Sequence, residues 1–182
     1  MRLAIVLTTV LSTLLLGSAI SLAAEESQTV EVGGLSIKVP AKFEKQEPKS
    51  RIIQYEFSAP KPEGAAADGR MTVMVAGGSV EANIQRWIGQ FQNPTGPDGK
   101  KAPETVKKEQ DGVTIHMVDL NGTYFDSAGG PFAPKVNREN YRMLGAILVT
   151  GDTQVFLKFY GPQETMKKYA EDFSSILKSV KK

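Results

Sequence analysis

The chain of 182 residues contains no cysteine, and this absence removes several possibilities. Without cysteine there is no disulfide staple and no thiol to carry a lipid anchor, so side-chain packing alone must hold the fold. Histidine is nearly absent too, with one residue in the whole sequence. A zinc site needs several cysteine or histidine ligands. We therefore expect no zinc site and, more generally, no cofactor.

A strong excess of one charge is also lacking. The chain has 22 basic and 20 acidic residues, which gives a formal net charge of +2. Proteins that bind nucleic acid usually carry an excess of lysine and arginine, which neutralise the phosphates. The lysines at 178, 181 and 182 do gather, but they follow a predicted helix and complement its dipole. We expect no nucleic-acid partner.

Residues 1–23 have the pattern of a cleavable signal peptide. A positive start at Arg2 precedes an apolar run from Leu3 to Leu16, and small residues at Ser21 and Ala23 suit signal peptidase. A retained anchor is the alternative, because the apolar stretch could just span a bilayer of about 30 Å. The small and polar residues that follow favour cleavage, after Ala23 or Ala24. We predict an exported protein, periplasmic or extracellular, with no stable membrane insertion after cleavage.

Residues 24–182 are long enough for a single domain with its own core. Alternating apolar residues next to turn-forming pairs predict three hairpins. Two further strands are expected between the first hairpin and the first helix. The hairpins cover residues 29–39, 105–124 and 141–160, with turns at Gly33-Gly34, Asp111-Gly112 and Gly151-Asp152, and the single strands cover 51–57 and 70–76. Residues 93–99 and 127–140 are expected to be loops.

Two amphipathic helices are predicted. The first begins after Ser79, a good N-cap, and its apolar stripe runs from Val80 to Phe91. The second follows Pro162, and its apolar stripe continues to Val180. Strands 141–149 and 155–160 are almost continuously apolar, which is typical of strands covered on both faces. The sequence therefore predicts an α+β fold, an antiparallel sheet flanked by helices on both faces in an α/β/α sandwich.

This order of elements resembles the fold shared by the PsbP photosystem proteins and the yeast Ran-binding Mog protein. Three segments, 77–91, 141–147 and 156–162 with the terminal helix, also resemble small secreted bacterial proteins of unknown function. The resemblance implies an accessory or binding role, because the characterised members of the fold are mostly not enzymes. It carries no photosystem or Ran-contact residue over to this chain.

Residues that could support chemistry do not form a recognisable set. His116 has no neighbour in sequence to orient it as a base, so a structural or surface role is expected. Met71 and Met74 invite a copper site, but side chains three apart on a strand point to opposite faces. Ser79 fits a helix cap better than a nucleophile, and the Gly-x-Ser-x-Gly pattern is absent. No catalytic or metal-binding residue is predicted.

Candidate partner-binding residues fall in two places. Three polar residues are spaced to share one side of the first helix, where the arginine could clamp a carboxylate. Three more lie in the predicted loop 127–140. The six residues are Asn83, Arg86, Gln90, Phe132, Lys135 and Arg138. The alternatives are that the helix residues satisfy loop backbone or pair with a nearby acid, and that the loop is an ordinary connection.

The favoured function is an exported, non-catalytic binding or accessory domain that contacts an envelope or periplasmic protein. The first alternative is an unrecognised hydrolase, or a carrier of a small ligand in a pocket beside the sheet. A copper carrier is the second alternative.

Overall fold

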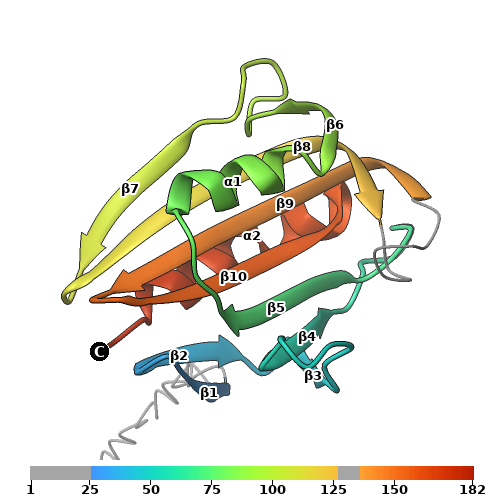
Figure 1. Cartoon of the computed structure of the whole chain (residues 1–182). Helices are drawn as coiled ribbons and strands as arrows, with labels where there is room; N and C mark the ends of the chain where they lie inside the picture. Colours follow the sequence, from blue (N-terminus) through green and yellow to red (C-terminus); the bar gives the residue numbers. More distant parts are fainter. Residues whose placement is uncertain (1–25, 127–135) are drawn as a thin grey trace, which may run out of the picture.

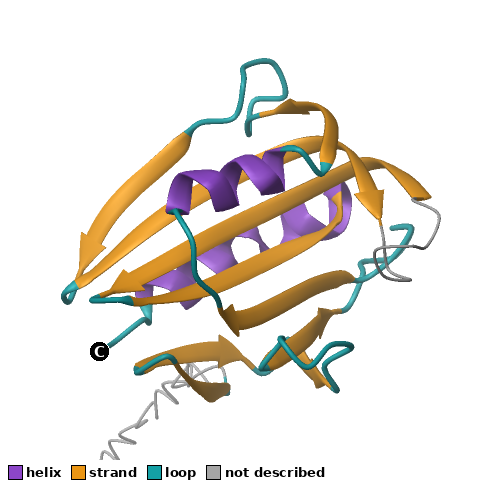
Figure 2. Ribbon diagram, viewed as in Figure 1, coloured by secondary structure: helices purple, strands orange, loops and turns teal. Residues whose placement is uncertain are grey.

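The computed structural model describes residues 26–126 and 136–182, which form ten strands and two helices (Figure 1). Eight strands make the main sheet in the order β3-β4-β5-β10-β9-β8-β6, with β7 also paired to β8, and neighbouring strands are antiparallel. These strands are β3 (Glu44–Gln46), β4 (Tyr55–Ala59), β5 (Gly69–Val75), β6 (Phe91–Thr95), β7 (Thr105–Gln110), β8 (Val113–Asp126), β9 (Val136–Thr150) and β10 (Thr153–Pro162). The remaining elements are β1 (Ser27–Val32), β2 (Leu35–Pro40), α1 (Val80–Ile88) and α2 (Gln163–Lys178). The predicted antiparallel sheet with two helices is confirmed, and Figure 2 shows the strands as the larger part of the fold.

The three predicted hairpins are present, and their turns have the backbone angles that tight turns require. Gly33 and Gly34 have φ of +58° and +77°, and they join β1 to β2. Asp111 and Gly112, with φ of +50° and +74°, join β7 to β8, and Gly151 at +56° lies between β9 and β10. Glycine adopts a positive φ at little cost, so these short sequences fix the register of each pair.

Strands β9 and β10 form the middle of the molecule. They pair over ten residues each, from Thr150 opposite Thr153 to Tyr141 opposite Pro162. Neighbouring residues of β10 enter different hydrophobic clusters: Leu157 packs with residues of α2, and Phe156 packs with residues of α1. In Figure 1, α1 lies in front of these strands and α2 lies behind them. The expected burial of this strand pair is confirmed for residues 143–148 and 155–157.

Each helix buries one apolar side. Met166, Tyr169 and Phe173 of α2 belong to the larger cluster, which we call the α2-side cluster. Ile84 and Trp87 of α1 belong to the smaller, α1-side cluster. Trp87 meets the ring of Phe156 edge-on at 5.9 Å between centroids. Ser79 caps α1 as predicted, because its side chain accepts a hydrogen bond from the Ala82 amide.

The β1–β2 hairpin is a separate two-stranded sheet that closes one end of the α2-side cluster. It buries five apolar side chains there: Val30, Val32, Leu35, Ile37 and Val39. The chain beyond α2 returns to it, where Ser36 and Lys181 exchange two backbone hydrogen bonds of 2.9 and 3.0 Å. The hairpin therefore ties the two ends of the described chain together.

Several predicted boundaries are wrong. The strand expected at 51–57 begins only at Tyr55, because residues 50–53 form a turn in which the Ile53 amide donates to the Ser50 carbonyl. Strand β3, at 44–46, was not predicted, since its three exposed residues show no apolar alternation. The first helix ends at Ile88 instead of Phe91, because Gly89 caps it and Phe91 is buried as the first residue of β6.

Both segments that were predicted as loops include strand residues. Strand β6 extends to Thr95 within the segment expected to be a loop from 93 to 99. Residues 136–140, expected in the second loop, belong to β9. Val180 lies beyond the end of α2, although it is buried in the α2-side cluster as the periodicity suggested. The predicted signal peptide lies outside the described residues, and no helix in 26–126 or 136–182 has the length and apolar character to cross a membrane.

Replacing Gly145 with alanine tests the packing of α1 on the sheet. A Cβ atom at Gly145 would lie 2.7 and 2.8 Å from two ring atoms of Trp87, and 3.1 Å from Val118. Overpacking of this kind costs about 1–3 kcal/mol. We expect G145A to lower the free energy of unfolding in urea by an amount in that range.

Gly77 provides the control, because a Cβ there meets no atom within 4 Å and its φ is not positive. We expect G77A to change the free energy of unfolding by much less than G145A. A G145A protein as stable as the original would contradict the close contact between Trp87 and β9.

Candidate functional site

A lysine on the α1 side of the sheet is the centre of the first candidate site. Lys158 lies in β10 between the buried residues Leu157 and Phe159, and its ammonium donates 2.6 Å to Oε1 of Gln90 and 3.1 Å to the hydroxyl of Tyr124. The ammonium also lies 5.0 Å from the ring centroid of Tyr124 and 4.7 Å from that of Tyr160. We call Lys158, Gln90, Tyr124 and Tyr160 the lysine–tyrosine cluster.

The surroundings of Lys158 disfavour its charged form. Burial, followed by the positive charges of Arg70 and Arg86, lowers the pKa of Lys158 to about 7, while Asp126 acts in the opposite direction. Among the described residues, no carboxylate lies within ion-pair distance of the ammonium. Burial also raises the pKa of Tyr124. A titratable group perturbed in this way within a defined cluster marks a functional-site candidate.

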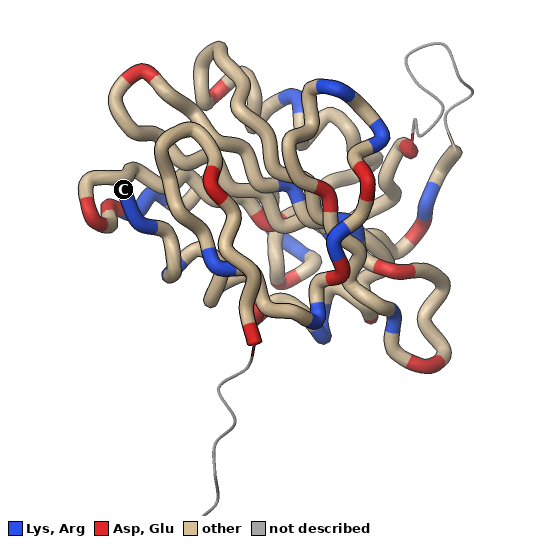
Figure 3. The backbone as a smooth tube through the Cα atoms, turned by 90° about the horizontal axis from the view of Figure 1, so that it is seen from below, with Lys and Arg blue, Asp and Glu red and all other residues tan. Residues whose placement is uncertain are grey.

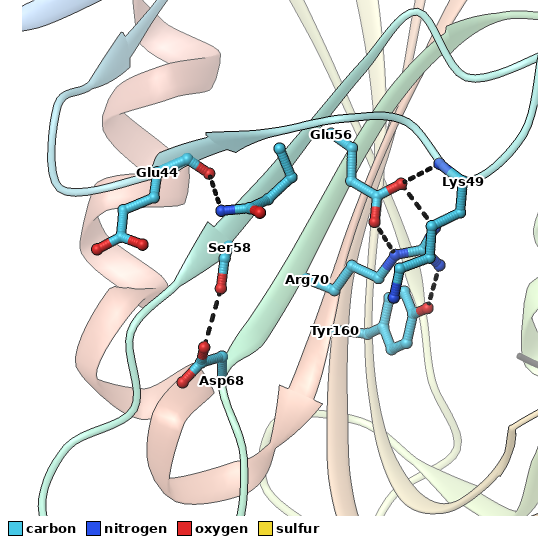
Figure 4. A network of polar contacts seen from close by, with 8 residues as sticks. Glu44, Lys49, Glu56, Ser58, Asp68, Arg70 and Tyr160 are labelled. Atoms are coloured by element: carbon cyan, nitrogen blue, oxygen red, sulfur yellow. Dashed lines mark hydrogen bonds and ion pairs between the residues drawn. The ribbon is translucent and has the colours of Figure 1, made fainter.

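A second polar network holds one wall of this cluster in place (Figure 4). Arg70 of β5 binds Glu56 of β4 with two hydrogen bonds of 2.7 and 2.9 Å, and it donates 2.7 Å to the hydroxyl of Tyr160. Glu56 is only 3% exposed, and it also accepts from the Lys49 amide. The hydrogen bond from Arg70 lowers the pKa of Glu56 despite its burial. Because Glu56 and Arg70 satisfy each other, this pair positions Tyr160 rather than offering a free charge.

The predicted polar strip on the first helix does not form as expected. Asn83 is buried, donates to the carbonyls of Gly77 and Ser79, and accepts 2.7 Å from Arg86. It therefore holds the turn that precedes α1. Gln90 is not on the helix, because α1 ends at Ile88, and it contacts Lys158 instead.

Of the other three candidate residues, only Arg138 is among the described residues. Arg138 belongs to β9, is exposed, and donates 3.3 Å to Asp126. Phe132 and Lys135 lie outside the described residues. Use of any of the six candidate residues in partner binding stays a prediction.

The sequence carries one signal that points to the lysine–tyrosine cluster. Lys158 is the only charged residue in β10, whose neighbours are mostly apolar. A long-chain cation in a buried strand is unusual and indicates special surroundings. Its partners could not be deduced, because Gln90 is 68 residues away and Tyr124 is 34 residues away in the chain.

The second candidate site is a groove of about 550 Å³ on the opposite, α2 side of the sheet. Its floor is formed by β8 and β9, and its walls are α2 on one side and β7 with the loop 96–104 on the other. Apolar side chains dominate the lining, including Met117, Leu144, Ala170, Phe173 and Leu177. Pockets that bind small molecules commonly have this size and this apolar character.

One ion pair supplies the polar part of the groove floor. Arg142 donates to both carboxylate oxygens of Asp119, at 2.9 and 2.7 Å. Two charges that neutralise each other in this way leave neither a free base nor a free cation. At the rim, Lys101 and Lys108 are balanced by Asp98 and Glu104. The lining is therefore neutral overall, and Figure 3 likewise shows basic and acidic residues interspersed along the chain.

The remaining sequence candidates occupy structural positions. Met71 is in the α2-side cluster and Met74 packs on the α1-side cluster, so the two thioethers lie on opposite faces as predicted. His116 is half-buried in β8 and paired in register with Ile147 and Lys107. Within 26–126 and 136–182, no three His, Asp or Glu side chains gather in a way that could hold a metal ion.

The pH dependence of stability tests the surroundings of Lys158. An unfolded lysine titrates near 10.4, so between about pH 7 and pH 10 the folded protein binds fewer protons than the unfolded chain. The Lys158 contribution to stability therefore rises with pH through this window. We expect the free energy of unfolding of the original protein, minus that of K158M, to increase by about 1–3 kcal/mol across it.

The matched control is K107M, since Lys107 is 61% exposed in β7. Its difference from the original protein should stay nearly constant over the same window. Urea unfolding at a series of pH values measures both differences. A gap to K158M that does not change with pH would show that Lys158 titrates like a surface lysine.

Comparison with known proteins shows a fold and no family. No protein-family model and no curated protein sequence matches the chain. The solution structure of cyanobacterial PsbP (CyanoP) from Synechocystis sp. PCC 6803 is similar, with a TM-score of 0.54 over 91% of this chain and 97% of that protein, at 10% sequence identity. The predicted likeness to Mog and to small secreted bacterial proteins stays a prediction. The chain has a PsbP-like fold.

Proposed function

We propose that this chain is an exported, non-catalytic binding or accessory domain, and that the groove on the α2 side binds its ligand. The observation that carries the proposal is an open apolar groove whose polar floor is already neutralised by Arg142 and Asp119. Such a site gains affinity from burial of apolar surface. Among the described residues that line it, no nucleophile is hydrogen-bonded to a base.

The chemistry of the lining indicates the ligand. Three basic and three acidic residues line the groove, so its net charge is zero. On the groove floor, where Arg142 and Asp119 are paired with each other, a charged ligand would lose hydration without gaining an unpaired partner, and this costs free energy. A small, largely apolar and uncharged molecule fits best. This favours the ligand-carrier alternative over the hydrolase alternative.

The fold supports the non-catalytic part of the proposal. A PsbP-like fold is consistent with an accessory domain, and the families that the chain resembles are mostly not enzymes. The helices support a three-layer arrangement, because α1 and α2 bury their apolar sides in two different clusters. Export is supported by the signal-like pattern of residues 1–23.

An envelope or periplasmic protein remains the second candidate partner. The feature that favours it is Arg86, which is exposed on α1 and already oriented by Asn83. Reversal of this charge in R86E would weaken such a contact and leave the groove on the other side of the sheet intact.

Filling the groove tests the main proposal. Ser174 is exposed on α2 and lines the groove, so a tryptophan there would occupy the space that a ligand needs. The neutral apolar dye Nile red is the probe, and its fluorescence increases when it leaves water. We expect the original protein to bind the dye and S174W to bind it at least about tenfold more weakly.

The neighbouring Ser175 supplies the control, since it is equally exposed on the same helix but does not line the groove. S175W should bind the dye like the original protein, and thermal unfolding should show that both variants are folded. Equal binding by S174W and the original protein, or no binding by either, would overturn the proposal.

A further inference from the structure

The hydrogen-bond partners of Lys158, which is half-buried between two buried apolar residues, are unusual for a lysine in such surroundings. A buried ammonium is normally compensated by a carboxylate, which can only accept hydrogen bonds. Here the partners are the amide of Gln90 and the hydroxyl of Tyr124, and both groups can donate as well as accept. They can therefore form hydrogen bonds with a charged nitrogen and also with an uncharged nitrogen.

Two nearby arginines disfavour the charged form of Lys158, although both are bound to other residues. Arg70 is occupied by Glu56 and Tyr160, and Arg86 is bound to Asn83. Their positive charges nevertheless act on Lys158 and disfavour its ammonium form. Titratable and charged groups lie around Lys158 on four strands and one helix: Arg70 on β5, Arg86 on α1, Tyr124 and Asp126 on β8, Tyr141 on β9 and Tyr160 on β10.

We propose that Lys158 is a covalent capture site for an aldehyde with a flat apolar body, which it binds through Nζ as an imine. The proposal rests on the geometry of the lysine–tyrosine cluster and is independent of the groove, which lies on the other side of the sheet. Capture is stoichiometric, so the site is a binding site and not a catalytic one.

The reaction balances without any further reagent. The lone pair of the uncharged Nζ attacks the carbonyl carbon and forms the C–N bond, and one proton passes from the nitrogen to the carbonyl oxygen, which becomes a hydroxyl group. A second proton then passes from the nitrogen to this hydroxyl group, the C–O bond breaks, and water leaves as the nitrogen lone pair forms the C=N bond. The Tyr124 hydroxyl, 3.1 Å from Nζ, can donate to the departing oxygen and afterwards to the imine nitrogen.

The aromatic side chains around the lysine indicate the shape of the aldehyde. The ring of Tyr124 stacks on Tyr141, with 6.0 Å between centroids and an interplanar angle of 6°, and contacts Tyr160 at 4.9 Å. Tyr141, Tyr160 and Lys158 are each half-buried, so this side of the cluster is open to solvent. Aromatic rings favour flat apolar partners, which can pack against their faces.

Reductive labelling with benzaldehyde and cyanoborohydride tests the proposal. At pH 7 an ordinary lysine has roughly one uncharged amine in 2,500, whereas the lowered pKa of Lys158 makes a much larger fraction of its amines uncharged. A lower intrinsic nucleophilicity and partial burial offset much of this advantage. We expect peptide mapping by mass spectrometry to show Lys158 labelled at least about tenfold faster than exposed lysines such as Lys107.

The nearly isosteric variant Q90E provides a sharp check, because it places a carboxylate 2.6 Å from the ammonium. The new ion pair should favour the charged amine and slow the labelling of Lys158 at least about tenfold at pH 7. The control is Q92E, the same substitution at an exposed residue two positions further along the chain, which should leave the labelling rate unchanged.

Two results would overturn the proposal: Lys158 labelled no faster than exposed lysines in the original protein, or labelling in Q90E as fast as in the original. Nile red binding is measured on the same samples. Dye binding that is retained while selective labelling is absent would separate failure of this inference from failure of the groove proposal.

Discussion

The structure depends on one constraint, which is that strands β9 and β10 have central stretches, residues 143–148 and 155–157, in which every residue is buried. They pair over ten residues in the middle of the sheet, and their successive side chains enter two separate hydrophobic clusters. A polar group buried on either face of this pair therefore costs free energy unless it has a hydrogen-bond partner. The two helices contribute to different clusters: α2 buries its apolar side in one, and α1 buries its apolar side in the other.

Both candidate sites follow from this arrangement. Helix α1 has only nine residues, so the side of the sheet that it covers retains half-buried positions, and Lys158 occupies one of them. On the other side, α2 lies beside β7 and the loop 96–104, and the uncovered part of β8 and β9 becomes the floor of the groove. The same sheet thus offers a polar, aromatic cluster on one side and an apolar, neutral groove on the other.

The sequence predicts those parts of the fold that depend on neighbouring residues. The Gly33-Gly34 turn and the Ser79 cap were identified correctly, because a tight turn and a helix start are determined within a few residues. The end of α1 was predicted wrongly. The apolar spacing of the helix continues through Phe91, but that residue is buried as part of a strand. The cluster around Lys158 lay beyond sequence reasoning, since it joins β10 to residues 34 and 68 positions away.

Amide hydrogen exchange tests the central constraint most directly. If β9 and β10 are covered on both faces, their backbone amides at 144–148 and 155–159 should exchange only through global unfolding, with protection equal to the full free energy of unfolding. The edge strands β3 and β7, which are exposed, should exchange through smaller openings. Protection in β9 and β10 no greater than in those edge strands would contradict the account.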